Sequence, residues 1–177
     1  MMVCPDDFRT PKYILRWMED HYGRTITHDG ACNELMLSRS GVYDGDENAV
    51  AAPIDIVTEE LPYNATVFIN PPWDSPTIEK LVLTAAKKTS QDTFIVFLLP
   101  NKLSNKAWVN FVLPHFTEIM FIGGRINFEG PNAAPAAKSR HGCFLGIIDG
   151  LHKHYYPDVM ATVDGVSLKR IRAGYDV

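Results

Sequence analysis

Val67-Phe68-Ile69-Asn70-Pro71-Pro72-Trp73 is the stretch that decides the fold of this 177-residue chain. Its apolar start predicts a buried strand. Pro71 and Pro72 then end the strand, because proline has no N–H group to donate to a sheet. The stretch therefore predicts a stiff polar loop with an aromatic ring at the carboxyl end of a strand, where open α/β sheets bind their ligands.

The loop has the residue types that activate an exocyclic amine or an amide nitrogen, which are poor nucleophiles because their lone pair is delocalised. The Asn70 side-chain oxygen and the Pro71 carbonyl offer two acceptors for the two N–H bonds, and the proline rings limit reorganisation. The Trp73 ring suits stacking on a planar base swung out of its helix. The competing interpretation is a turn that merely ends a strand.

Asn70-Pro71-Pro72-Trp73 resembles the Asp/Asn-Pro-Pro-aromatic motif of amino methyltransferases that use S-adenosylmethionine. The chain is more similar to the phage-type DNA adenine-N6 methyltransferase (Dam-like) family than to the amide or RNA branches, over roughly residues 10–148. The matching stretches are, in order, Thr10-Pro11, His28-Asp29-Gly30-Ala31-Cys32, Asn70 to Trp73, Gly124-Arg125-Ile126-Asn127-Phe128 and Ser139.

The resemblance implies a Rossmann-like α/β fold with a mostly parallel central sheet flanked by helices. It also implies S-adenosylmethionine as cofactor and DNA as partner, in methylation of the restriction–modification kind. The catalytic residues that it implies are Asn70, Pro71, Pro72 and Trp73, and the cofactor-binding residues are Thr10, Pro11, Asp29, Gly30, Ala31 and Asn70.

The chain departs from the wider class because it lacks a Gly-x-Gly loop, so the cofactor contacts stay open at this point. Thr10-Pro11 also reads as a plain helix start, and Asp29-Gly30 as a common turn pair. The acid that would bind the cofactor ribose is undecided between the acidic cluster at 44–47 and Asp55.

Charge is unevenly distributed along the chain. The formal net charge of −4 argues against strong indiscriminate nucleic-acid binding. Residues 1–74 hold 13 acidic and 5 basic side chains, whereas residues 75–177 hold 8 acidic and 12 basic ones. We therefore expect phosphate contacts from the second half. The expected DNA-binding residues are Arg125, Lys138, Ser139 and Arg140, and the alternative is a plain surface loop.

The composition, with 46% hydrophobic and 21% charged residues, is that of an ordinary globular protein, which we expect to form one domain over residues 1–177. No apolar run reaches membrane-spanning length. Three dispersed cysteines indicate reduced thiols and a cytoplasmic location (the host cytoplasm if the protein is phage-encoded), and the six histidines show no metal-ligand spacing. No separate target-recognition domain is evident, so loose specificity and a homodimer are both open.

Hydrophobic periodicity and Pro/Gly punctuation predict alternating strands and helices, with right-handed crossovers. Thr10 is the expected N-cap of the first helix. The expected helices are 12–22, 77–88 and 108–116, the last interrupted by Pro114; the expected strands are 24–28, 54–57, 67–69, 93–99, 118–122 and 141–148, followed by a short hairpin within 152–177.

Two alternatives to a DNA adenine methyltransferase stay open at this stage. A methyltransferase of the same fold with an RNA base or a glutamine amide as acceptor would keep the Asn-Pro-Pro-Trp loop. A degenerate domain that binds DNA without turnover would explain the missing Gly-x-Gly loop, but not the intact Asn70 to Trp73 stretch.

Overall fold

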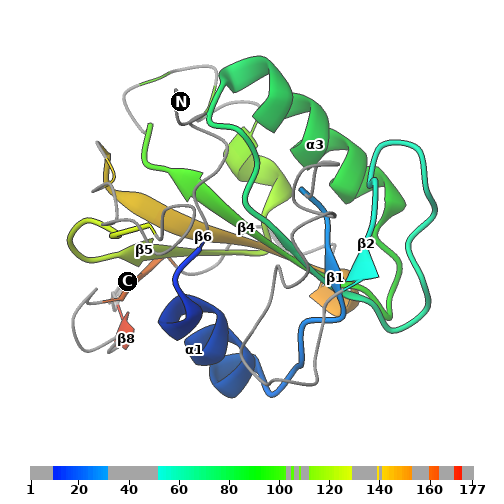
Figure 1. Ribbon diagram of the computed structural model, residues 1–177, viewed down its shortest axis with the longest axis horizontal. Helices are drawn as coiled ribbons and strands as arrows, with labels where there is room; N and C mark the ends of the chain where they lie inside the picture. Colours follow the sequence, from blue (N-terminus) through cyan, green and yellow to red (C-terminus); the bar gives the residue numbers. More distant parts are fainter. Residues whose placement is uncertain are drawn as a thin grey trace, which may run out of the picture.

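The computed structural model describes residues 10–31, 52–102, 105, 108, 112–128, 139, 141–152, 160–163 and 170–172. Helical elements are interspersed among the strands in this part of the chain, without the strict alternation that the sequence predicts (Figure 1). The helical elements are α1 (Lys12–Tyr22), α3 (Ser75–Lys88) and the short 3-10 turns η3 (Leu113–His115) and η5 (Gly150–His152). The strands are β1 (His28–Asp29), β2 (Ala52–Pro53), β3 (Thr66–Ile69), β4 (Phe94–Pro100), β5 (Glu118–Ile122), β6 (Cys143–Asp149), β7 (Met160–Val163) and β8 (Arg170–Arg172).

Eight strands of the described residues form one sheet, in the order β2-β1-β3-β4-β6-β5-β7-β8. The strands β2, β1, β3 and β4 are parallel to one another, whereas β6 runs antiparallel to both β4 and β5. The expected α/β class is confirmed, but the sheet is mixed, so the expectation of a mostly parallel sheet is not. Because β6 is antiparallel to both of its neighbours, β4 and β5 point the same way, as does β3. The carboxyl ends of β1, β3, β4 and β5 therefore meet at one edge.

The core has two layers, one on each face of the sheet. Side chains of β3 and β4 alternate between them, since successive residues of a strand point to opposite faces. Ile14, Leu15 and Met18 of α1 pack with one set, and Ile78 and Val82 of α3 pack with the other. Figure 1 shows the two helices on opposite sides of the sheet. Both β3 and β4 are buried on both faces, which is why their sequences are continuous apolar runs.

The first helix has the predicted bounds but a different start. Its N-cap is Pro11, without a side-chain cap, and the Thr10 hydroxyl instead accepts a hydrogen bond from Asn70. Gly23 ends the helix in the left-handed conformation, with φ 62°. The second helix starts two residues earlier than predicted, because the Asp74 carboxylate caps the Thr77 N–H at 2.9 Å.

Two of the expected elements near the amino-terminal half are wrong. The strand predicted over 54–57 is a turn, because the Asp55 carboxylate accepts from Val57 N at 2.9 Å and from the Thr58 hydroxyl at 2.7 Å. Short polar side chains that bond their own backbone compete in this way with sheet pairing. The paired segment is β2, just before this turn, and the strand predicted over 24–28 is reduced to β1.

The expected helix over 108–116 is only partly within the described residues, where Pro114 lies in the 3-10 turn η3. After it, Phe116 packs against Gly146 of β6, where an added Cβ atom would lie 2.6 Å from the phenylalanine ring. The hairpin predicted in the carboxyl-terminal part is confirmed as β7 and β8, and β7 also extends the sheet next to β5.

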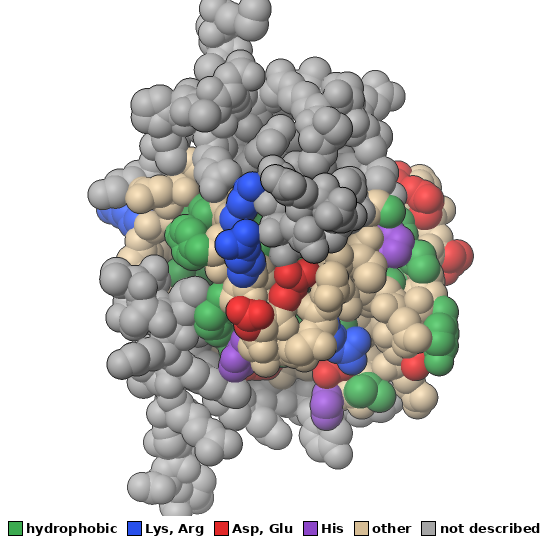
Figure 2. All heavy atoms as spheres, turned by 60° about the horizontal axis from the view of Figure 1, so that its bottom comes forward, with side chains coloured by type: hydrophobic (Ala, Val, Ile, Leu, Met, Phe, Trp, Pro, Cys, Tyr) green, Lys and Arg blue, Asp and Glu red, His purple; other side chains and the backbone are tan. Residues whose placement is uncertain are grey.

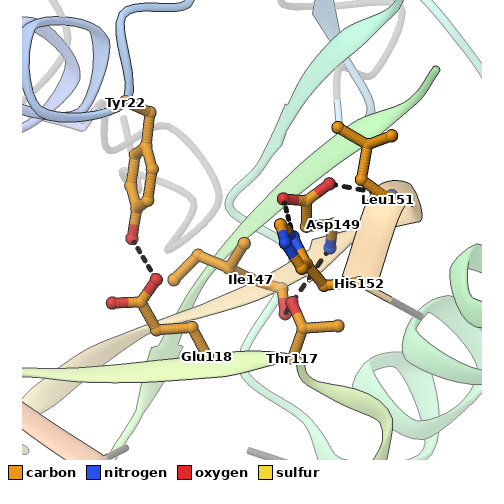
Figure 3. Close-up of polar contacts among 7 residues, drawn as sticks. All are labelled: Tyr22, Thr117, Glu118, Ile147, Asp149, Leu151 and His152. Carbon is orange, nitrogen blue, oxygen red and sulfur yellow. Dashed lines mark hydrogen bonds and ion pairs between the residues drawn. The ribbon is translucent and has the colours of Figure 1, made fainter. Parts of the chain in front are cut away.

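Hydrogen bonds close the end of the sheet that lies opposite the gathered carboxyl ends. Thr117 joins β5 to β6: its N–H and hydroxyl both donate to the Ile147 carbonyl, and its hydroxyl accepts from Asp149 N. Figure 3 shows this contact together with the Tyr22 hydroxyl donating to Glu118 and His152 beside Asp149 at 2.8 Å. The side chains of these residues hold this end of the sheet together.

Candidate functional site

The carboxyl ends of four strands bring together polar residues that are far apart in the sequence. Asp29 ends β1, Asn70 follows β3, Lys102 follows β4, and the segment Gly123–Phe128 follows β5. Thr10, just before α1, joins them through its bond to Asn70. Because the strands point the same way, sheet register alone sets these residues at one edge.

Asn70 is held by hydrogen bonds at both ends of its carboxamide. Its Nδ2 donates to Thr10 Oγ1 at 3.2 Å, and its Oδ1 accepts from Trp73 Nε1 at 3.3 Å. An indole nitrogen only donates, so the atom facing it must be the amide oxygen. Pro71 is buried and Pro72 is exposed, which anchors one side of the loop against the protein. The amide orientation of Asn70 is therefore determined by its neighbours.

Trp73 is held on three sides. Its indole donates to Asn70, its ring meets Phe128 edge-to-face with centroids 5.4 Å apart, and its backbone carbonyl accepts from Lys102 Nζ at 3.2 Å. Lys102 Nζ also lies 3.4 Å from Ser75 Oγ, at the start of α3. The ring is only partly buried, against the core layer that also contains α1. Lys102 thus ties the loop after β3 to the end of β4.

The Asp29 side chain is buried, with 8% of the residue exposed. Burial raises the pKa of its carboxyl from 3.8 to about 6, and the hydrogen bond from Ala31 N, at 2.9 Å, offsets part of the rise. That bond is the one hydrogen bond that the carboxyl accepts within the described residues. A buried carboxylate with unused acceptor capacity fits a cationic or hydrogen-bond-donating ligand.

Gly30 is required by packing on the neighbouring strand. A Cβ atom at this position would lie 2.9 Å from Ile69 Cγ1 and 3.1 Å from Val67 Cγ1, and Gly30 N donates to the Phe68 carbonyl at 2.9 Å. The glycine therefore lets the loop after β1 close tightly over β3. This brings Asp29 and Asn70, which end neighbouring strands, to the same place.

The expected DNA-binding residues separate into three cases. Arg125 is exposed and follows Gly124, whose φ is 83°. Lys138 and Arg140 lie outside the described residues. Ser139 is buried, with its hydroxyl hydrogen-bonded to the His141 carbonyl and its N–H donating to Ile126 at 2.9 Å. We therefore assign Ser139 to holding the segment after β5 against the start of β6, in place of the expected phosphate contact.

On the side of the molecule that carries α1, the described residues carry charges of both signs and form no one-sign field for a phosphate backbone. Figure 2, which brings this side forward, shows basic and acidic side chains next to each other. On α1 itself, exposed Arg16 lies one turn from exposed Asp20. Opposite charges at this spacing on a helix partly neutralise each other.

Sequence reasoning missed the roles of Lys102 and Phe128. Both follow strands that end at the site edge, and that position is the signal that would have found them. Of the undecided ribose acids, the 44–47 cluster lies outside the described residues. Asp55 lies in the turn after β2, with its pKa lowered by hydrogen bonds from Thr58 and Val57.

Metal and thiol chemistry have little support in the described part of the chain. No three His, Cys, Asp or Glu side chains gather there in a way that would hold a metal ion. Cys143 is a buried free thiol whose pKa burial raises to about 11, which keeps it protonated and unreactive. None of the described helices is long and apolar enough to cross a membrane.

The sequence matches a model of a known protein family. The model described as DNA N-6-adenine-methyltransferase (Dam) matches residues 3–171, which is most of the chain and includes every site residue discussed above. No individually curated protein matches the sequence.

Proposed function

This chain belongs to the DNA N-6-adenine-methyltransferase (Dam) family, and on that premise we propose which of its residues carry the reaction. It is an adenine-specific DNA methyltransferase, which removes the RNA base and the glutamine amide as leading alternatives. The observation that carries the proposal is the Asn70 carboxamide, oriented by Thr10 and Trp73 at the edge where four strands end.

Asn70 and Pro71 act on the adenine amine in this proposal. The Asn70 Oδ1 and the Pro71 carbonyl accept hydrogen bonds from the two N–H groups of the adenine amine. The nitrogen therefore becomes tetrahedral, and its lone pair is free to attack. With its lone pair freed, the amine would take the methyl group that the bound donor supplies, the donor sulfur would keep the electrons of the broken bond, and the nitrogen would then lose a proton. Such acceptors stabilise charge that develops in the transition state, and the proline-stiffened loop needs little reorganisation.

The residues after β1 fit S-adenosylmethionine as the methyl donor. When bound, this cofactor supplies an electrophilic methyl group on a sulfonium. Asp29, whose buried carboxylate accepts one hydrogen bond within the described residues, would hold a donor group or offset positive charge beside Gly30 and Ala31. Thr10 and Pro11 lie at the start of α1, where Thr10 is hydrogen-bonded to Asn70. The ribose contact stays open between Asp55, in the turn after β2, and the acidic cluster at 44–47. The parallel β2-β1-β3-β4 half supports a Rossmann-like arrangement.

The adenine and the DNA backbone have separate contacts in the proposal. Trp73 stacks on the extruded base beside Asn70. Arg125 contacts phosphate from the segment after β5, and Lys138 and Arg140 remain predicted contacts. A cytoplasmic location, a homodimer and a phage or restriction–modification role also stay predictions.

The test is methyl transfer itself. Purified protein is incubated with methyl-labelled S-adenosylmethionine and unmethylated duplex DNA, and the nucleosides are then separated. We expect label in N6-methyladenine from the wild type and none above background from Asn70→Ala. Equal labelling by both proteins would refute the role of Asn70. Cofactor binding without any labelling would instead favour a non-catalytic domain.

A further inference from the structure

The hydrogen bond between Trp73 and Asn70 decides what the Asn70 side chain can do. A carboxamide presents an acceptor at one end and two donors at the other, and a half-turn about its terminal bond exchanges them. If Nδ2 faced the adenine amine, two donors would oppose each other and the amine would not be activated. Asn70 is therefore useful only in one of its two orientations.

Two neighbours impose that orientation. Trp73 Nε1 can only donate, so it selects the amide oxygen, at 3.3 Å. Thr10 Oγ1 then receives Nδ2 at 3.2 Å. The oxygen has two lone pairs, and the indole uses one, which leaves the second for an incoming amine.

We propose that the Trp73 indole N–H is a positioning group that keeps Asn70 in its acceptor orientation, separately from any stacking by the same ring. The inference rests on the proposed role of Asn70. It requires an indole that does not swing away from the loop. The edge-to-face contact with Phe128 and the Lys102 bond to the Trp73 carbonyl hold both the ring and the backbone of this residue.

The importance of the indole N–H depends on which residue stands at position 70. An aspartate has two equivalent oxygens, so either orientation presents an acceptor and no orienting donor is needed. The indole N–H should therefore matter when position 70 is asparagine and matter little when it is aspartate. A phenylalanine at position 73 keeps an aromatic ring but has no N–H.

The experiment is a double-mutant cycle on the full chain, with single-turnover methylation of unmethylated duplex DNA at saturating cofactor. The proteins are wild type, Trp73→Phe, Asn70→Asp and the double variant. We expect Trp73→Phe to lower the rate about tenfold beside Asn70, as for loss of one hydrogen bond, and by less than about twofold beside the aspartate. Changes in stacking are common to both backgrounds and cancel.

A second variant covers the case in which Asn70→Asp is inactive or unfolded. Replacing Trp73 by 3-benzothienylalanine keeps a bicyclic ring and exchanges the N–H for sulfur. We expect the methylation rate to fall about tenfold, with unchanged affinity for duplex DNA carrying 2-aminopurine in place of the target adenine. Trp17→Phe, on α1 and stacked on His21 at 4.7 Å, is the control and should leave both quantities unchanged.

The outcomes separate the inference from the proposed function. Equal losses from Trp73→Phe in both backgrounds, or a benzothienyl variant as fast as wild type, would overturn the orienting role alone. Wild-type turnover by Asn70→Ala would overturn the role of Asn70 itself. An affinity loss that matches the rate loss would return Trp73 to stacking only.

Discussion

Replacing Asp29 by asparagine should stabilise the protein at neutral and alkaline pH while weakening cofactor binding. Burial raises the pKa of the Asp29 carboxyl from 3.8 to about 6, so the folded protein disfavours the ionised form. Asparagine has the same shape, carries no charge, and its amide oxygen can still accept the Ala31 N–H. The substitution thus removes the charge and little else.

The magnitude follows from the pKa difference. The folded state holds the Asp29 proton more tightly than the unfolded chain, so this group's contribution to stability is fully present below about pH 4 and is lost as the pH rises through 6. One pKa unit corresponds to about 1.4 kcal/mol, which makes the full loss about 3 kcal/mol. Between pH 4.5 and pH 8 the asparagine variant should gain about 2 kcal/mol of unfolding free energy relative to wild type.

Urea unfolding at pH 4.5, 6 and 8 measures this gain, with exposed Asp20→Asn on α1 as the matched control. Calorimetric titration with S-adenosylmethionine at pH 8 measures the expected loss of cofactor affinity. A hydrogen bond to a charged group contributes about 1.5–3 kcal/mol, so the dissociation constant should rise by at least about tenfold. If the difference in unfolding free energy between wild type and Asp29→Asn does not change with pH, the destabilising effect of the buried Asp29 charge is refuted. An unchanged dissociation constant would return Asp29 to a role in the turn alone.

Three further predictions concern the loop, the DNA face and the core. Asn70→Ala should lower turnover about 10²–10³-fold with cofactor affinity retained, measured by steady-state methylation, and turnover within a few-fold of wild type would contradict the acceptor role. The triple variant Arg125→Ala, Lys138→Ala, Arg140→Ala should reduce the log–log salt slope of duplex binding by about 0.9 per lost phosphate contact, and an unchanged slope would exclude these residues as the DNA face. Gly146→Ala should cost about 1–3 kcal/mol in urea unfolding, because its Cβ atom would overlap a buried phenylalanine ring, and an unaltered midpoint would show that the ring moves away freely.

Local sequence patterns predicted the elements whose ends are marked by proline or glycine, or whose whole length is apolar. Pro11 and Gly23 bracket α1, and the continuous apolar run from 93 to 99 predicted a central strand, which the structure has as β4, buried on both faces. The pattern failed at 54–57, where the apolar spacing suggested a strand but Asp55 bonded its own backbone. A competition between a side chain and a sheet is decided by a few hydrogen bonds, which hydrophobic periodicity does not register.

The composition of the site was predictable and its internal contacts were not. The Asn-Pro-Pro-Trp loop was identifiable because its prolines end an apolar run, and Asp29 because the stretch around it resembles the cofactor loop of the family. The contact between Trp73 and Phe128 depends on β5 lying parallel to β4 two positions away, with β6 between them. That arrangement is a long-range pairing, and no local sequence feature specifies it. The orientation of the Asn70 amide likewise depends on Thr10, sixty residues earlier.

The position of β5 in the sheet also bears on how the enzyme is made. Both of its neighbours, β6 and β7, come later in the chain, so during synthesis β5 has no partner strand until residues 143–149 have left the ribosome. The segment Gly123–Phe128, which supports Trp73, cannot take its place before then. A nascent chain that already contains Asp29 and Asn70 is therefore still without an assembled site. Most of the chain must therefore be synthesised before the segment after β5 can support Trp73.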